Sequence, residues 1–140
     1  MPVSNSDVES CLRRCLESEG FTLSPNRAFG ENGVDILARK EDQEYQIEVI
    51  GYKQAGPMRA KDFYEAFFKA VARLDQGAKR CVIAQASNAK VGLPARAAQR
   101  KTAWLRIGET FPEVELWFVD TSAGTYERTT WRQWVEPASK

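Results

Sequence analysis

The sequence predicts one α/β domain, in which a mixed central sheet is flanked by helices on both faces. Its 140 residues suit a single core, because single domains cluster near about 100–150 residues. Segments with strand periodicity alternate with helical segments, an order that favours right-handed crossovers between parallel strands. We therefore expect a single domain over residues 1–140, with a core over about 6–120 and a C-terminal appendage over 121–140.

The first part of the chain predicts a helix followed by a hairpin. Ser6 and Glu9 form a capping box before apolar residues at helical spacing, so we expect a helix that ends at Gly20. Residues 21–32 are rich in turn formers and predict a loop or a short strand. Apolar and polar residues alternate over 34–49, which predicts a β-hairpin.

The second part of the chain alternates between helix and strand. Helical spacing of apolar residues predicts a helix over 58–76, and Pro94 at a first helical position predicts another to about Trp104. Short apolar runs predict strands over 80–86 and 114–119. The two tryptophans near the C-terminus predict a short amphipathic helix over 131–135.

The composition excludes several classes of site. The chain contains no histidine, which excludes Ser-His-Asp hydrolysis, Cys-His nucleophiles and histidine-ligated metals. Three cysteines cannot complete a four-cysteine zinc site, and we expect Cys11, Cys15 and Cys81 to be reduced. Neither a leader pattern nor an apolar stretch near the ~20 residues of a membrane span is present, so we expect a cytoplasmic protein. P-loop and dinucleotide fingerprints are also missing, and we expect no small-molecule cofactor.

Two acidic residues of the predicted hairpin face each other if its turn has two residues. A turn at 41–42 pairs Lys40 with Gln43 and places Asp35 opposite Glu48. Facing side chains lie ~4.5–5.5 Å apart at Cβ, where like charges oppose folding unless a proton, an arginine or a cation compensates. Mg²⁺ takes oxygen ligands from carboxylates and leaves its other positions to water and phosphate. The alternatives are a solvated polar face or a three-residue turn that shifts the register.

Both carboxylates lie in short apolar runs. Asp35 stands in GVDILA, and Glu48 stands thirteen residues later in IEVIGY. Over about residues 8–86 the chain resembles the PD-(D/E)xK, or restriction-endonuclease-like, nuclease superfamily. The resemblance implies an αβββαβ core, Mg²⁺ or Mn²⁺ as cofactor and DNA as substrate. It implies that Asp35 and Glu48 are catalytic and metal-binding, that the Val49 carbonyl is a further ligand, and that Glu9 is either an additional acidic residue of the site or a cap.

The resemblance fails at the lysine of the family motif, where Ile50 stands. That lysine activates the attacking water and neutralises charge in the transition state. Lys53 replaces it if Gly51 introduces a bulge that resets the strand alternation, and Lys69 replaces it from the predicted helix 58–76. The alternatives are that both are ordinary surface lysines, or that catalysis is lost and a module that binds DNA or a protein partner is left.

A basic segment without acidic residues extends over 88–108. Net charge is −4 over 1–57, with six basic and ten acidic residues, and +5 over 58–140. Arg96 and Arg100 lie four residues apart on a predicted helix, where like charges repel unless an anion or solvent compensates. We expect DNA phosphates as that anion, with a solvated helix face as the alternative and a second copy of the chain or another protein as further partners. The candidate DNA-binding residues are Lys90, Arg96, Arg100 and Lys101.

Overall fold

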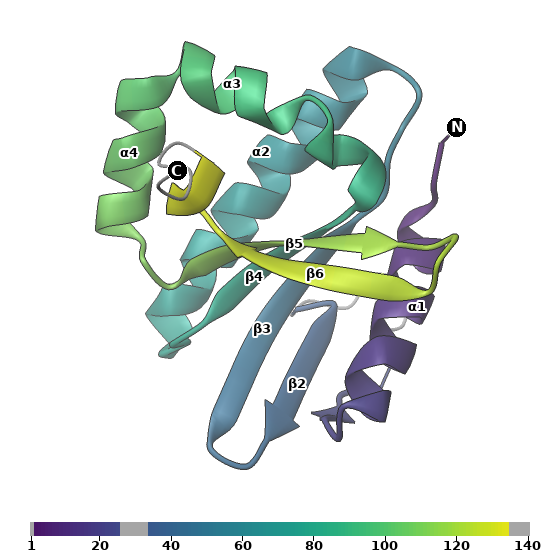
Figure 1. The fold of residues 1–140 in the computed structure, drawn as a ribbon. Helices are drawn as coiled ribbons and strands as arrows, with labels where there is room; N and C mark the ends of the chain where they lie inside the picture. The colour runs from purple at the N-terminus through teal and green to yellow at the C-terminus, as the bar shows by residue number, and fades with distance from the viewer. Residues whose placement is uncertain (1, 26–33, 135–140) are drawn as a thin grey trace, which may run out of the picture.

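The computed structural model describes residues 2–25 and 34–134, which form an α/β fold around one mixed sheet of six strands (Figure 1). The strands lie in the order β1-β2-β3-β4-β5-β6, with β3, β4 and β5 parallel and the outer pairs antiparallel. Their bounds are β1 Thr22–Leu23, β2 Ile36–Lys40, β3 Gln43–Ile50, β4 Cys81–Ala86, β5 Val114–Asp120 and β6 Thr125–Thr130. The α-helices are α1 Asn5–Ser18, α2 Gly56–Ala72, α3 Leu93–Gln99 and α4 Lys101–Thr110. Among these residues no helix combines the length and the apolarity needed to cross a membrane.

Helices cover both faces of the sheet, which confirms the predicted α/β class with a mixed central sheet. Figure 1 shows α1 on one side of the strands and α2, α3 and α4 on the other. The buried apolar side chains accordingly form two clusters, one under α1 that includes Trp117 and one under the other helices that includes Phe118. Neighbouring residues of β5 thus point to opposite faces, as the strand period of two requires.

The start of α1 differs from the sequence prediction. Ser4 caps the helix instead of Ser6, and its Oγ accepts a hydrogen bond from the Asp7 backbone N–H at 3.0 Å. The cap lies two residues earlier because Val3 forms an antiparallel bridge with Tyr52, which holds the preceding chain in an extended conformation. The predicted capping box is therefore wrong.

The helix expected from Pro94 to Trp104 is interrupted. Arg100 leaves the helical conformation with φ −123° and ψ 43°, so α3 and α4 are separate helices. The break orients α4 so that the Trp104 ring stacks on Trp131, with ring centroids 4.5 Å apart. Each indole N–H donates to the other residue's carbonyl at 2.9 Å. This tertiary contact overrides a helical pattern that is continuous in the sequence.

The segment expected to form an appendage begins with a strand of the sheet. β6 pairs antiparallel with β5, from Asp120 opposite Thr125 to Glu115 opposite Thr130. Tyr126 packs on Trp117 from this strand, with ring centroids 5.4 Å apart. The predicted tail helix is a single 3₁₀ turn over Arg132–Trp134; Val135 lies outside the described residues, as does most of the predicted loop over 21–32.

Gly51 anchors the N-terminal segment against β3. Val3 and Tyr52 exchange two backbone hydrogen bonds of 2.9 and 2.7 Å, and the Gly51 N–H donates to Asn5 Oδ1 at 2.6 Å. A Cβ atom at Gly51 would stand 2.2 Å from the Val3 carbonyl oxygen, which is a backbone atom and cannot rotate away.

We expect Gly51→Ala to destabilise the protein by about 1–3 kcal/mol, because the Val3 segment must move away from β3. Urea denaturation followed by circular dichroism measures this loss. Gly92→Ala is the matched control, since a Cβ there meets no atom within 4 Å. Equal stability of Gly51→Ala and the parent protein would contradict the expected clash.

Candidate active site

The hairpin has the register that brings Asp35 and Glu48 together. β2 and β3 pair Lys40 with Gln43 and Ile36 with Ile47, so the turn has two residues. Glu41 in this turn has φ 56°, the left-handed conformation that tight hairpin turns use. The last pair of the ladder is Ile36 with Ile47. Continuing the register by one more residue places Asp35, the neighbour of Ile36, opposite Glu48. Gly33, at the start of the motif, lies outside the described residues.

Asp35 and Glu48 line one cavity of about 150 Å³ next to α2. The alternation of β3 explains this placement, because Ile47 and Val49 belong to the core under α1 whereas Glu48 faces the opposite side. Asn5, which is the first residue of α1, also lines the cavity. The charged residues that α2 contributes to the lining are Asp62, Glu65 and Lys69.

Glu48 is a buried carboxylate with a cationic partner. Its side chain is 4% exposed, and Oε2 accepts a hydrogen bond from Arg73 Nε at 3.1 Å. Burial raises the pKa of Glu48, and the nearby charge of Asp35 raises this pKa further. Arg73 and Lys69 act in the opposite direction, but the pKa of Glu48 remains above its usual value. Negative charge at this position is thus only partly compensated by the protein.

Asp35 is positioned by backbone groups. Its Oδ2 accepts a hydrogen bond from the Val49 N–H at 2.8 Å, which ties the carboxylate to β3. Its carbonyl oxygen accepts from Arg13 at 3.1 Å, and Arg13 is in turn paired with Glu9 at 2.8 Å. Glu9 is not among the described residues that line the cavity. Its partner is Arg13, so Glu9 acts neither as the predicted cap nor as part of the cavity wall.

The two candidate lysines have different positions. Lys69 lines the cavity from α2, with Nζ 3.4 Å from Glu65 Oε1. Lys53 is not among the described lining residues and pairs with Asp62 at 3.1 Å. Ile50 lines the cavity two residues after Glu48 on the same face of β3, which is where a motif lysine would stand. The cavity therefore receives its lysine from a helix and an apolar side chain from the strand.

The oxygen donors of this cavity suit Mg²⁺ or Mn²⁺ with an incomplete protein ligand set. Asp35 and Glu48 provide two carboxylates, and Val49 lines the same space. Across residues 2–25 and 34–134, no three acidic, cysteine or histidine side chains lie close enough to hold a metal by themselves. Mg²⁺ commonly binds through one or two carboxylates and completes its shell with water and substrate phosphate. The donor chemistry thus fits a cation that is bound by two protein carboxylates and completes its coordination shell with water and substrate phosphate.

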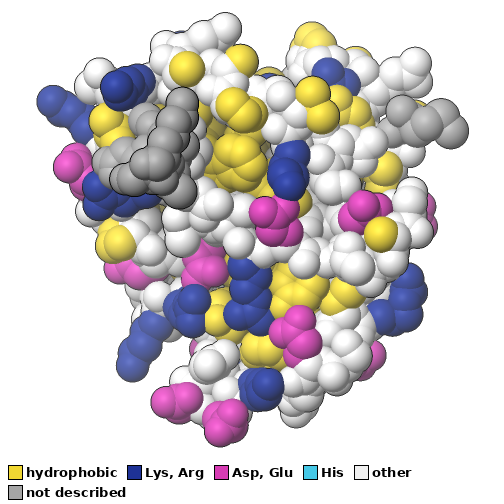
Figure 2. All heavy atoms as spheres, viewed as in Figure 1, with side chains coloured by type: hydrophobic (Ala, Val, Ile, Leu, Met, Phe, Trp, Pro, Cys, Tyr) yellow, Lys and Arg dark blue, Asp and Glu magenta, His cyan; other side chains and the backbone are white. Residues whose placement is uncertain are grey.

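The basic residues expected to bind DNA have different surroundings in the structure. Lys90 is ion-paired with Glu127, whereas Arg100 and Lys101 are exposed at the junction of α3 and α4. Arg96 instead lines a second cavity. On the face that Figure 2 shows, Lys and Arg side chains are interspersed with Asp and Glu. The helix predicted to carry Arg96 and Arg100 ends between them, because the chain leaves the helical conformation at Arg100.

Gln85 is a buried polar residue that the sequence patterns above do not single out. It is the single polar residue within the otherwise apolar run of β4, CVIAQA, and is 5% exposed. A lone amide in such a strand was the available signal, since buried polar side chains need partners.

Comparison with protein-family models, with curated proteins and with solved structures finds no match for this chain. Its function is therefore inferred from the residues and contacts described above.

Proposed function

We propose that this protein binds DNA and hydrolyses its phosphodiester bonds with Mg²⁺ or Mn²⁺, on a fold of the restriction-endonuclease-like type. The observation that carries the proposal is the convergence of Asp35, Glu48 and Lys69 on one cavity. Two carboxylates and one ammonium group are the set that metal-assisted phosphodiester hydrolysis needs, because they place a cation and neutralise developing charge.

The order of the elements supports the proposed fold. From α1 to β4 the chain forms a helix, three strands, a helix and a strand, which is the order that the sequence resemblance implies. The acidic pair lies at the β2–β3 hairpin, and Lys69 lies on the helix that follows it. A lysine supplied from this helix compensates for Ile50 in the motif.

Each residue of the cavity has a role that follows from its contacts. Asp35 and Glu48 would hold the cation, with Asp35 oriented by the Val49 N–H and Glu48 by Arg73. The bound cation would polarise the phosphoryl oxygen and lower the pKa of a water molecule. Lys69 would place positive charge beside the scissile phosphate.

A catalytically inactive module of the same fold, which binds DNA or a protein partner, is the second candidate. Ile50 favours it, because an apolar side chain lines the cavity at the place of the motif lysine. The pairing of Glu48 with Arg73 also favours it, because this contact occupies one carboxylate oxygen.

Nicking of supercoiled plasmid DNA tests the first candidate. We expect the protein to convert plasmid to the open-circular form with Mg²⁺ or Mn²⁺ and not with EDTA, and we expect Asp35→Asn to abolish the conversion. Asp42→Asn is the matched control, because Asp42 is exposed at the turn of the same hairpin. Salt-sensitive DNA binding without any nicking by the parent protein would favour the inactive module.

A further inference from the structure

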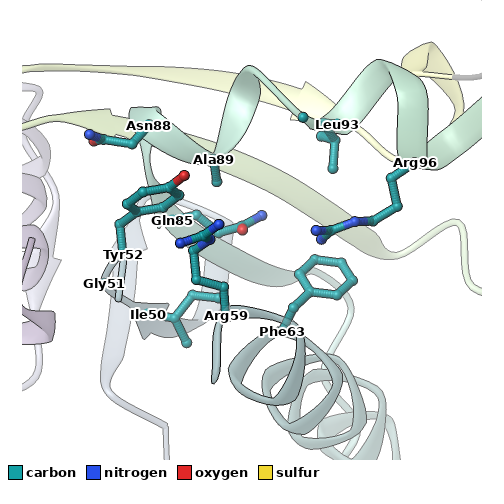
Figure 3. Close-up of a pocket in the computed structure, with 11 residues that line it drawn as sticks. Ile50, Gly51, Tyr52, Arg59, Phe63, Gln85, Asn88, Ala89, Leu93 and Arg96 are labelled. Carbon is teal, nitrogen blue, oxygen red and sulfur yellow. The ribbon is translucent and has the colours of Figure 1, made fainter. Parts of the chain in front are cut away.

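A second cavity, of about 100 Å³, adjoins the candidate active site. Ile50 lines both cavities, so they lie next to each other at this side chain. Figure 3 shows how three elements converge here, with Arg59 reaching in from α2, Arg96 from α3 and Gln85 from β4. The role inferred for this second cavity rests on the proposed function and extends it to a neighbouring position on the same ligand.

Gln85 presents an unpartnered donor to this cavity. The residue is 5% exposed, and its Nε2 atom makes no hydrogen bond within the described part of the chain. A buried amide N–H that lacks an acceptor carries a desolvation cost, so such groups are normally satisfied. An acceptor atom of a ligand in the cavity would satisfy it.

The two arginines bring positive charge without a counter-charge. Of the described residues that line the cavity, none is acidic. Arg96 is partly buried, and its side chain makes no hydrogen bond or ion pair with the described residues. Arg59 donates to the carbonyls of Lys53 and Gln54 at 2.8 and 2.7 Å, and its guanidinium lies 4.6 Å from the Tyr52 ring centroid. These contacts fix the direction of Arg59 and leave its charge uncompensated.

The guanidinium groups of Arg59 and Arg96 and the amide of Gln85 favour a ligand with negatively charged oxygen atoms. Guanidinium groups bind phosphate through parallel N–H donors, and the Gln85 amide adds a neutral donor to the same space. Asn88 also lines the cavity and offers a further amide. Two like charges that face a common cavity favour a ligand that carries negative charge on several oxygens, which describes a phosphate group.

We propose that Arg59, Arg96 and Gln85 form a phosphate subsite that binds a backbone phosphate of DNA next to the one in the candidate active site. Because Ile50 lines both cavities, the proposed ligand would place the phosphates of neighbouring nucleotides in the two cavities. The subsite would set the position of the strand, since phosphate contacts fix register without reading sequence.

Binding of a fluorescent duplex oligonucleotide in EDTA tests the subsite separately from catalysis. We expect Arg96→Gln to weaken binding about tenfold and to lower the slope of log K against log salt by about 0.9. Arg14→Gln removes the same charge from α1, on the opposite face of the sheet, and should change neither quantity. Gln85→Met, which keeps the side-chain length, should weaken binding without changing the salt slope, because no charge is lost.

A second arm of the experiment uses inorganic phosphate as the probe. Thermal stabilisation by phosphate that Arg96→Gln removes, together with unchanged oligonucleotide binding, would overturn the assignment to DNA. Unchanged binding of both probes by Arg96→Gln would overturn the subsite itself. If the parent protein fails to nick plasmid but Arg96→Gln still lowers affinity and salt slope, the proposed hydrolysis fails and the subsite stands.

Discussion

We expect Lys69→Ala to lower the rate of plasmid nicking by about 100- to 1,000-fold, the usual cost of losing one group that stabilises transition-state charge. Lys69 is the lysine that lines the cavity with Asp35 and Glu48, and it lowers the pKa of Glu48 through its charge. Time courses of nicking at saturating Mg²⁺ measure the effect. Lys53→Ala should leave the rate nearly unchanged, because Lys53 lies outside the cavity lining and pairs with Asp62.

A rescue variant separates a role in the reaction from a role in folding. Ile50 lines the same cavity from β3, on the face that Glu48 occupies. Ile50→Lys combined with Lys69→Ala should therefore restore a substantial part of the nicking rate by returning an ammonium group from the strand. Equal nicking by Lys69→Ala and the parent protein would remove Lys69 from the proposed mechanism.

We expect Arg73→Met to destabilise the protein by about 3–5 kcal/mol near neutral pH, because it leaves a buried charge without its partner. The Glu48 side chain is 4% exposed, and Arg73 supplies its hydrogen bond and lowers its pKa. Without Arg73 the pKa of Glu48 rises further above its usual value. Urea denaturation at about pH 7.5 and about pH 5 measures the loss.

The direction of the pH dependence follows from the raised pKa. Glu48 binds a proton more readily in the folded protein, so the stability it contributes is present at low pH and is lost as pH rises through its folded-state pKa. The loss caused by Arg73→Met should accordingly be smaller at the acidic pH, where a larger fraction of Glu48 is protonated. Glu48→Gln combined with Arg73→Met should recover most of the stability and flatten the pH dependence. An equal loss at both pH values would contradict this account of the pair.

Local patterns predicted the hairpin well because its register depends on few residues. Alternating apolar side chains on both sides of the turn at Glu41 admit one register that buries Ile36 and Ile47 together, and this register also brings Asp35 to Glu48. The cavity could be anticipated from the same pairing. The position of Lys69 relative to it depends on how α2 packs on the sheet, which no local pattern specifies.

Other features depend on contacts between distant segments. The break at Arg100 follows from the stacking of Trp104 on Trp131, and the cap at Ser4 follows from the bridge between Val3 and Tyr52. Helical periodicity contains no information about either contact. Gln85 could be flagged as a buried polar residue, but its two arginine neighbours come from helices that are separated along the chain.

The bridge between Val3 and Tyr52 has a practical consequence for recombinant protein. Asn5 lines the candidate active site, and Val3, the residue before the helix cap, is bridged to Tyr52 just after β3. A purification tag fused ahead of Val3 would lie only a few residues from Asn5, and so near the cavity in which the proposed DNA ligand would bind. The nicking and binding experiments proposed here should therefore use protein from which an N-terminal tag has been cleaved.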